Sequence, residues 1–345
     1  MEVLDANQCR ANAPHLFPVS DALLYVSGLS VRFRLDSARE ASVLRNVSFA
    51  IASGKIVGLL GESGCGKTTT ALAMMQLLSA AAHVRGSIEF RGEGLLTLNE
   101  SELRKIRGAE ISIIYQDSNV LNPVMRVGDQ VLEVLRAHKK LCSDQMREEV
   151  LALFTAVGFE DADRIYRAYP HQLSGGQRRR IAIAQALICK PQLVIADEPT
   201  AWLDADASFE TLELIANLRD LYGTAFLLIS HDPEALAAIA DEVLVMYAGE
   251  IVESGPTHEV FAQPKHPYTE ALLQCNVPIV APADGRKHAL PCIPGQAPDP
   301  SELMTGCSFA ERCRDRMEVC NTRSPELLSI SEARSVRCFK YGEGA

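Results

Sequence analysis

The pattern of apolar and polar positions predicts strands and helices that alternate along most of the chain. Alternating apolar residues predict strands over 23–33 and 43–50. Short continuous apolar runs predict buried strands at 56–60, 192–196, 225–229 and 243–247. The stretches 68–79 and 208–221 have helical composition. Buried strands that alternate with helices are typical of a largely parallel sheet, so we expect an α/β fold.

The same pattern predicts three regions. Residues 1–20 are mixed in character and predict a loose tail. Residues 21–260 carry the α/β pattern, with a more polar, helix-rich stretch over 99–169. Residues 261–345 are rich in proline and cysteine with weak periodicity, which predicts a separate C-terminal extension.

Composition narrows the class of protein. The net charge of −10 argues against a nucleic-acid binder, which normally carries a basic excess. The N-terminus shows no basic start followed by an apolar core, so we expect no secretory signal. The longest nearly apolar run, 71–84, is too short to cross a bilayer. We therefore expect a cytoplasmic chain whose connection to a membrane depends on partner subunits.

A glycine-rich loop follows the predicted strand at 56–60 and precedes the predicted helix. Its residues match G-x-x-x-x-G-K-[ST] in full and are Gly61, Glu62, Ser63, Gly64, Cys65, Gly66, Lys67 and Thr68. Glycines let backbone N–H groups turn inward onto phosphate oxygens, and the helix N-terminus adds its dipole. Lys67 is expected to reach the β- and γ-phosphates, and the Thr68 hydroxyl to ligate Mg²⁺. The alternative is a glycine-rich turn that matches by chance.

Two acids close the apolar strand at 192–196. Asp197 is a candidate Mg²⁺ ligand, and Glu198 is a candidate general base that polarises the attacking water. Ligands bind at such strand ends in open α/β sheets. A solvated acidic turn is the alternative for this pair taken alone.

The segment Leu173-Ser174-Gly175-Gly176-Gln177 lies between these two motifs. In that order and place it resembles the signature of the ABC ATPase family. Ser174, Gly175 and Gly176 open a helix and so present N–H donors to an anion. The resemblance implies a P-loop ABC ATPase domain with a RecA-like parallel core, an antiparallel β subdomain and an α-helical subdomain. It also implies that the anion is the γ-phosphate of ATP held by the opposite subunit.

The resemblance implies further site residues. Phe33 corresponds to the aromatic residue that stacks on adenine, although it could simply be a strand core residue. Gln116 corresponds to the glutamine that senses the metal and the water, Asp204 to the acid of the D-loop between the two ATPase chains, and His231 to the switch histidine. The implied catalytic residues are Glu198, His231, Gln116 and Lys67. The implied Mg²⁺ ligands are Thr68, Gln116 and Asp197. The implied ATP contacts are Phe33, 61–69 including Thr69, Ser174, Gly175, Gly176, Gln177 and Asp204.

Three segments narrow the branch. They resemble segments of the oligopeptide/dipeptide import branch of the family, which also takes up nickel and other solutes. The segments are Gly61-Glu62-Ser63, 121–123 and especially Lys265–Leu273 (KHPYTEALL). The implied partners are two membrane permeases, a second ABC ATPase subunit of the same or a related chain, and an extracytoplasmic binding protein. The implied place is the cytoplasmic face of the inner membrane, as a peripheral protein. A soluble ABC ATPase that acts on DNA ends or ribosomes is the rival, but this chain lacks its usual coiled coil or tandem cassette.

Four of the ten cysteines crowd into the extension. Their spacing, Cys307-x5-Cys313-x6-Cys320-x17-Cys338, resembles the quartet of the same branch, which is thought to hold a four-iron iron–sulfur cluster. Four thiolates can hold such a cluster or Zn²⁺, and the spacing lacks the tight C-x2-C pairs of zinc ribbons. We therefore expect an iron–sulfur cluster in a structural role, with Zn²⁺ and unligated thiols as the alternatives. A redox or metal sensor that gates transport is a further alternative.

Two features depart from the branch pattern. The segment 116–123 is one residue shorter than usual, which puts the coupling to membrane subunits in doubt. Trp202 stands where the branch has a small residue, next to the expected D-loop. The nature of the cargo is not encoded in these motifs.

Overall fold

The computed structural model describes residues 22–36, 39–116, 121–276, 291–302 and 304–342, and it divides into two compact units. Unit 1 combines the residues up to 50, the range 57–96 and the range from 231 onward, and unit 2 combines 51–56 and 97–230. The predicted tail at 1–20 and residues 117–120 of the shortened segment lie outside the described residues. Among the residues described, no helix is long and apolar enough to cross a membrane.

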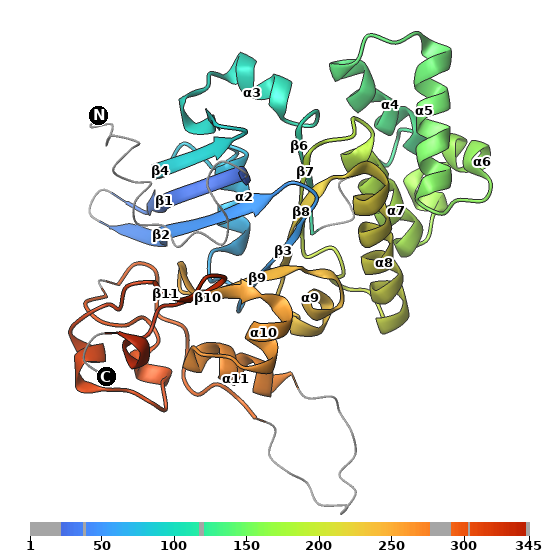
Figure 1. Cartoon of the computed structure of the whole chain (residues 1–345). Coiled ribbons are helices and arrows are strands. Elements are labelled where there is room, and N and C mark those ends of the chain that lie inside the picture. The colour runs from blue at the N-terminus through green and yellow to red at the C-terminus, as the bar shows by residue number, and fades with distance from the viewer. Residues whose placement is uncertain (1–21, 37–38, 117–120, 277–290, 303, 343–345) are drawn as a thin grey trace, which may run out of the picture. The chain divides into compact units, whose positions relative to one another are not determined.

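Unit 1 contains an antiparallel sheet with the strand order β2-β1-β4-β5. Its strands are β1 (Ala22–Arg34), β2 (Glu40–Ala52), β4 (Ala82–Phe90) and β5 (Glu93–Gly94). β1 pairs with β4 along most of its length, from Leu24 opposite Phe90 to Phe33 opposite Ala82. This sheet is the antiparallel β subdomain that the family resemblance implied (Figure 1).

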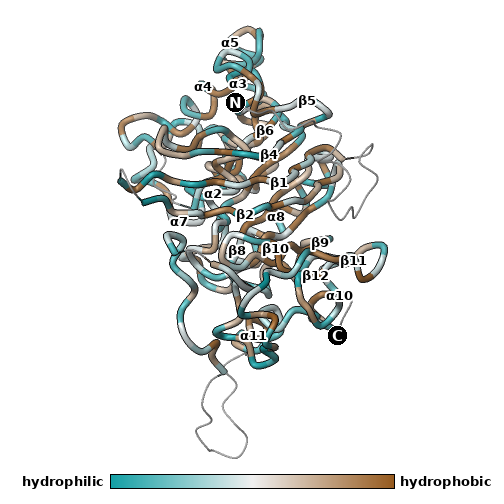
Figure 2. The backbone as a smooth tube through the Cα atoms, turned by 90° about the vertical axis from the view of Figure 1, so that its left-hand side faces the viewer, coloured by the Kyte–Doolittle hydropathy of each residue, from teal (hydrophilic) through white to brown (hydrophobic). Residues whose placement is uncertain are grey.

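A second run of strands in unit 1 has the order β11-β12-β10-β9-β3. The strands are β3 (Ile56–Leu60), β9 (Glu242–Tyr247), β10 (Glu250–Pro256), β11 (Leu328–Ser331) and β12 (Arg334–Val336). β3 and β9 are fully buried and run parallel, with Gly58 opposite Val243. Figure 2 shows hydrophobic residues along β9, as expected for a strand that is buried on both faces.

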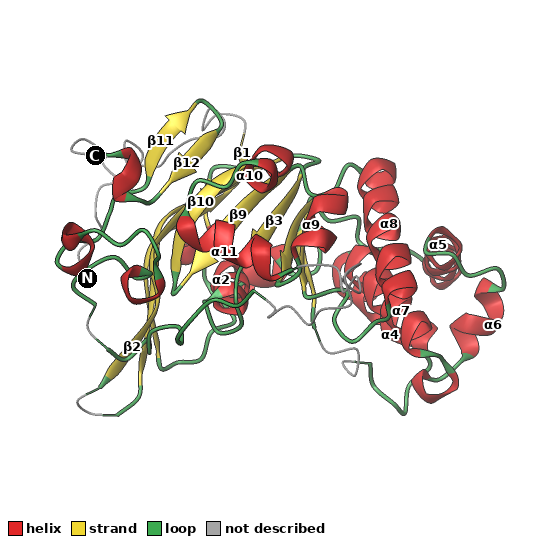
Figure 3. Cartoon of the chain, turned by 90° about the horizontal axis from the view of Figure 1, so that it is seen from below, coloured by secondary structure: helices red, strands yellow, loops and turns green. Residues whose placement is uncertain are grey.

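The helices of unit 1 lie beside these strands. They are α2 (Lys67–Met74), α9 (Pro233–Ile239), α10 (Thr257–Ala262) and α11 (Pro267–Cys275), with 3₁₀ turns at Ala310–Arg312, Glu318–Asn321 and Phe339–Tyr341. Figures 1 and 3 show α9, α10 and α11 on the same side of β10, β9 and β3.

Unit 2 combines a parallel sheet with a group of helices. The strands β6 (Ile111–Ile114), β7 (Leu193–Asp197) and β8 (Ala225–Ser230) are parallel neighbours in that order. The helices are α3 (Glu100–Ile106), α4 (Val127–His138), α5 (Ser143–Ala156), α6 (Ala162–Arg167), α7 (Gly175–Leu187) and α8 (Ala205–Tyr222). Helices α4, α5 and α6 pack on one another and form the expected α-helical subdomain. The α/β fold with a parallel core is therefore confirmed.

Candidate nucleotide-binding site

The glycine-rich loop Gly61–Thr68, called the phosphate loop below, joins the buried strand β3 to α2 in unit 1. This arrangement confirms the predicted strand–loop–helix context. Gly66 is the N-cap of α2 with φ +112°, a conformation that favours glycine. A Cβ at Gly66 would lie 2.6 Å from Leu44 Cδ2, and a Cβ at Gly61 would collide with the carbonyl oxygen of Met246. The fold of this chain therefore requires glycine at both ends of the loop.

Lys67 is the first residue of α2, and its side chain turns back into the loop. It is only 7% exposed, and Nζ donates to the carbonyl oxygens of Gly61 at 2.7 Å and Glu62 at 3.1 Å. An ammonium group that folds over a ring of backbone atoms is suited to bind phosphate oxygens as a point charge. The exposed Thr68 follows on the first turn of α2, where a hydroxyl oxygen is a ligand chemistry that Mg²⁺ accepts.

Cys65 is buried in the loop, and burial raises the pKa of its thiol. A thiol held protonated is a poor nucleophile, so this cysteine serves as a small filler. Phe33 lies near the end of β1 and is half-buried, which fits an aromatic side chain with one face available.

In unit 2, the two predicted acids lie where β7 ends. Asp197 is the last residue of β7 and is 4% exposed, and Glu198 is 8% exposed. Glu198 has φ +50°, and its N–H donates to the carbonyl oxygen of Ile229 on β8 at 2.9 Å. A glutamate in the left-handed backbone region costs conformational energy, and strain of this kind concentrates at functional positions. The left-handed backbone turns the chain at Glu198, directly after Asp197, the residue that ends the strand.

The segment Leu173–Gln177, called the signature turn below, begins helix α7 in unit 2, as predicted. Ser174 is the N-cap: its Oγ accepts from the N–H of Gln177 at 3.2 Å, and Gln177 Oε1 accepts from the N–H of Ser174 at 3.0 Å. This capping box fixes the turn and leaves Gly175 and Gly176 exposed at the first two helical positions. Their N–H groups and the helix dipole form an anion-binding arrangement.

The comparisons with known proteins agree with this geometry. A family model described as "ABC transporter" matches residues 44–201, and one described as "Oligopeptide/dipeptide transporter, C-terminal region" matches 252–320. The chain is 40% identical over 331 residues to the oligopeptide transport ATP-binding protein OppD of Escherichia coli, covering 96% of both chains. It is 42% identical to AppD of Bacillus subtilis, an oligopeptide transport ATP-binding protein, covering 86% of this chain and 90% of that one. This chain belongs to the oligopeptide/dipeptide family of ABC transporter ATP-binding proteins.

Solved structures agree on the fold of this ABC ATPase. The ATP-binding cassette MJ0796, solved as a dimer in a post-hydrolysis state bound to ADP and Pi, matches with a TM-score of 0.60 and 25% identity. The match covers 68% of this chain and 98% of that one. The cbiO1 protein from Clostridium perfringens, part of the ABC transporter complex cbiONQ, matches with a TM-score of 0.61 and 27% identity over 70% of this chain and 92% of that one.

Three further predicted residues of the ABC ATPase follow a strand or begin a helix. Gln116 is exposed just after β6, and His231 is exposed just after β8. Asp204 is the N-cap of α8, where its carboxylate accepts from the N–H of Ala207 at 2.8 Å. This capping bond gives Asp204 a local structural role, and its predicted role between two ATPase chains stays a prediction.

Sequence reasoning missed Arg179 of α7. Arg179 is 2% exposed, and it donates to the carbonyl oxygens of Tyr115 at 2.9 Å and Gln116 at 3.0 Å. It therefore anchors the segment that carries the predicted sensor glutamine to the helix that begins at the signature. The only signal in the sequence is a basic run, Arg178-Arg179-Arg180, which usually indicates a solvated helix face.

The extension of this ABC ATPase joins unit 1 through buried polar contacts. Glu253 on β10 is fully buried and accepts from Arg334 on β12 at 2.7 Å. The same carboxylate accepts from the N–H groups of Lys265 at 2.9 Å and His266 at 2.8 Å. His266 in turn caps α11, accepting at Nδ1 from the N–H of Tyr268 at 3.0 Å. The KHPYTEALL segment thus has a specific structural function: its first residues bind the buried Glu253 carboxylate, and His266 caps the N-terminus of α11.

The four predicted cluster cysteines lie in unit 1 and are free thiols. The N–H of Cys307 donates to the carbonyl oxygen of Cys320 at 2.8 Å. Burial, and after it the charges of Cys320, Cys338 and Cys313, raise the pKa of Cys307 to about 11. The quartet has the donor chemistry of a metal centre, but within the described ranges no three His, Cys, Asp or Glu side chains are placed to hold a metal ion.

Proposed function

We propose that this chain is the ATP-hydrolysing subunit of an ABC importer of di- and oligopeptides, and that Lys67 and Glu198 are its essential phosphate-binding and catalytic groups. The observation that carries the proposal is the phosphate loop, where both bounding glycines are required and Lys67 Nζ lies 2.7 Å from the carbonyl oxygen of Gly61. The peptide cargo is supported by OppD and AppD, which are both named for oligopeptide transport. Nickel or another small solute is the alternative cargo.

In the proposed mechanism, N–H groups of the loop and the Lys67 ammonium bind the β- and γ-phosphates of ATP. The carboxylate of Glu198 accepts a hydrogen bond from the attacking water and orients it toward the γ-phosphorus. Thr68, Gln116 and Asp197 are the proposed ligands of Mg²⁺, which neutralises phosphate charge when it is bound. His231 is proposed to contact the γ-phosphate.

The signature turn is proposed to act on a second ATPase subunit. Ser174, Gly175, Gly176 and Gln177 would bind the γ-phosphate of ATP held by that subunit, so ATP closes the dimer and hydrolysis reopens it. The dimeric structure of MJ0796 supports this arrangement. Closure is proposed to reorient two permeases at the cytoplasmic face of the inner membrane, with peptide supplied by an extracytoplasmic binding protein. No nucleic acid takes part.

The test compares Glu198→Gln and Lys67→Ala with Glu213→Gln, an exposed acid on α8. We expect Glu198→Gln to bind a fluorescent ATP analogue as the unmodified chain does and to lose turnover at least about 100-fold. Lys67→Ala should lose both binding and turnover, and Glu213→Gln should lose neither. Unimpaired hydrolysis by Glu198→Gln would remove the general-base assignment, and unimpaired binding by Lys67→Ala would remove the proposed site.

The cysteine quartet is proposed as a structural metal site, with a four-iron iron–sulfur cluster favoured over Zn²⁺. Its support is the free state of the four thiols and the hydrogen bond from the N–H of Cys307 to the carbonyl oxygen of Cys320. Anaerobic purification followed by absorption spectroscopy and iron and zinc analysis tests it. About four irons with a broad band near roughly 400 nm would support the cluster, one zinc without colour would support a zinc staple, and neither metal would leave the thiols unligated.

A further inference from the structure

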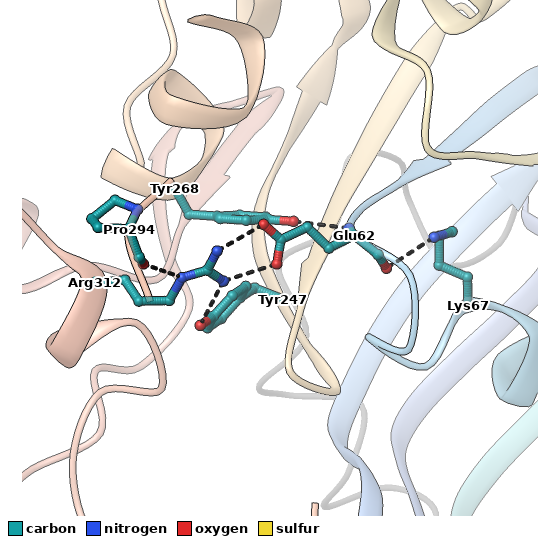
Figure 4. A network of polar contacts seen from close by, with 6 residues as sticks. All are labelled: Glu62, Lys67, Tyr247, Tyr268, Pro294 and Arg312. Atoms are coloured by element: carbon teal, nitrogen blue, oxygen red, sulfur yellow. Dashed lines mark hydrogen bonds and ion pairs between the residues drawn. The ribbon is translucent and has the colours of Figure 1, made fainter. Parts of the chain in front are cut away.

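The C-terminal extension forms an ion pair with the second residue of the phosphate loop (Figure 4). Arg312 Nη1 donates to Glu62 Oε2 at 2.8 Å, and Nη2 donates to Glu62 Oε1 at 3.0 Å. The Arg312 side chain is 6% exposed and the Glu62 side chain 26%. A bidentate pair between planar groups, partly withdrawn from water, is the strong form of an ion pair.

Arg312 is held in place by contacts other than Glu62. Its Nε donates to the carbonyl oxygen of Pro294 at 2.9 Å, and Nη1 also donates to the Tyr247 hydroxyl at 3.3 Å. The guanidinium lies against the ring of Tyr247, which packs on Tyr268 and Phe309. The guanidinium of Arg312 is therefore held in place by these aromatic side chains before it binds Glu62, and little side-chain entropy is lost when the ion pair forms.

The backbone of Glu62 is fixed as well. Its N–H donates to the Tyr268 hydroxyl at 2.9 Å, and its carbonyl oxygen accepts from Lys67 Nζ. The extension thus holds the side chain and the N–H of Glu62, and the phosphate-binding lysine holds its carbonyl group. All these residues belong to unit 1.

The charge of Glu62 makes this contact matter for nucleotide binding. A carboxylate in a loop that binds a triphosphate repels the ligand, and the repulsion is large where water is partly excluded. A bidentate arginine neutralises that charge and keeps the carboxylate directed toward the extension. Arg312 also lines a cavity of about 270 Å³ with Cys307 and Cys320, so the segment that supplies it is the cysteine-containing one.

We propose that Arg312 is a positioning residue for the phosphate loop: acting through Glu62, it neutralises the loop carboxylate and fixes the loop for the nucleoside triphosphate. The C-terminal extension thereby sets the affinity for ATP. This inference rests on the proposed function of the loop, and Lys67→Ala tests that function separately. If Lys67→Ala abolishes binding while Arg312 variants bind normally, the inference alone fails.

The experiment measures binding of a fluorescent ATP analogue and the KM and kcat for ATP, using the full chain with Arg312→Met. Arg316→Met is the matched control, because Arg316 lines the same cavity but donates to Asn321 within the extension. We expect Arg312→Met to raise Kd and KM about tenfold, with kcat changed less than about twofold. Arg316→Met should bind as the unmodified chain does. Equal affinities for the two variants would overturn the proposal.

The double variant E62Q/R312M separates charge from packing. If Arg312 acts by neutralising Glu62, removing the carboxylate should restore Kd to within about threefold of the unmodified chain, and high salt should reduce the defect of the single variant. A defect that persists in the double variant and at all salt concentrations would mean a general structural role and would overturn the inference. Should Arg312→Met fail to fold, Arg312→Lys keeps the charge but not the fork, and it should raise Kd about threefold.

Discussion

The phosphate loop and the signature turn are both glycine-containing turns that open a helix, but their glycines have different neighbours. In the loop, a Cβ at Gly61 or Gly66 would collide with Met246 or Leu44 of the same chain. In the signature turn, a Cβ at Gly175 or Gly176 would meet no heavy atom of the described chain within 4 Å. The first turn therefore needs glycine at both of its ends, because other atoms of the chain leave no room there for a side chain. The second carries helix-weakening residues with no reason inside the described chain, which points to a ligand or partner outside it.

Gly61→Ala tests the internal requirement and should have the largest effect on stability. The new Cβ would overlap the carbonyl oxygen of Met246 and lie 2.7 Å from Cys65 Sγ, so β9 or the loop must move. We expect a loss of at least about 3 kcal/mol in the free energy of unfolding without nucleotide, measured by urea denaturation. Gly176→Ala is the control, and equal stability of the two variants would remove the distinction between the turns.

Arg179→Met tests whether the signature helix supports the segment that carries Gln116. The substitution leaves the carbonyl oxygens of Tyr115 and Gln116 without the buried guanidinium that donates to them. We expect a loss of about 2 to 3 kcal/mol in unfolding free energy. Arg178→Met, one residue away, removes a donor to the carbonyl oxygen of Leu173 only and should cost about half as much. If Arg178→Met proved the more damaging change, the anchoring role of Arg179 would be lost.

His266 gives the extension a stability that depends on pH. Its pKa falls from 6.5 to about 3 because burial disfavours the charged ring, and the positive charge of Arg337 also lowers it. The Glu253 carboxylate accepts from the backbone N–H of His266. Between those pH values the unfolded chain binds a proton that the folded chain does not. The stability is therefore complete above pH 6.5 and declines as the pH falls, by about 2 kcal/mol between pH 8 and pH 5.

The comparison variant for this pH dependence is His266→Asn, which keeps an N-cap acceptor and does not titrate. Urea denaturation of both chains at several pH values gives the difference that belongs to the histidine. If His266→Asn loses as much stability on acidification as the unmodified chain does, the buried histidine is not the source.

Sequence reasoning found the motifs of the core because each is local. The strand at 56–60, its loop and its helix are adjacent in the chain, and β3 (Ile56–Leu60) has the predicted bounds. It missed β11 and β12, because the alternation of β11 (LSIS) spans only four residues and β12 (RSV) has only three. They are strands because β12 pairs with β10 and β11 pairs with β12. It also missed Arg179 and Arg312, because the sequence does not distinguish an arginine that forms a surface salt bridge from one that forms buried hydrogen bonds. Arg312 is 250 residues from its partner Glu62.

Gly176→Ala has the smallest expected effect on stability, and it is the sharpest test of the difference between the phosphate loop and the signature turn. Gly176→Ala places a good helix former at the second position of α7, where the backbone is not in the left-handed region and a Cβ has space. We expect the free energy of unfolding to rise by about 0.5 kcal/mol. Yet ATP turnover should fall at least about tenfold, because the methyl group keeps a phosphate from the backbone N–H groups. In the Glu198→Gln background, sedimentation should show an ATP-dependent dimer with glycine at 176 and a monomer with alanine. A stabilised chain that still dimerises and turns over normally would mean that the open space above the signature turn has no ligand.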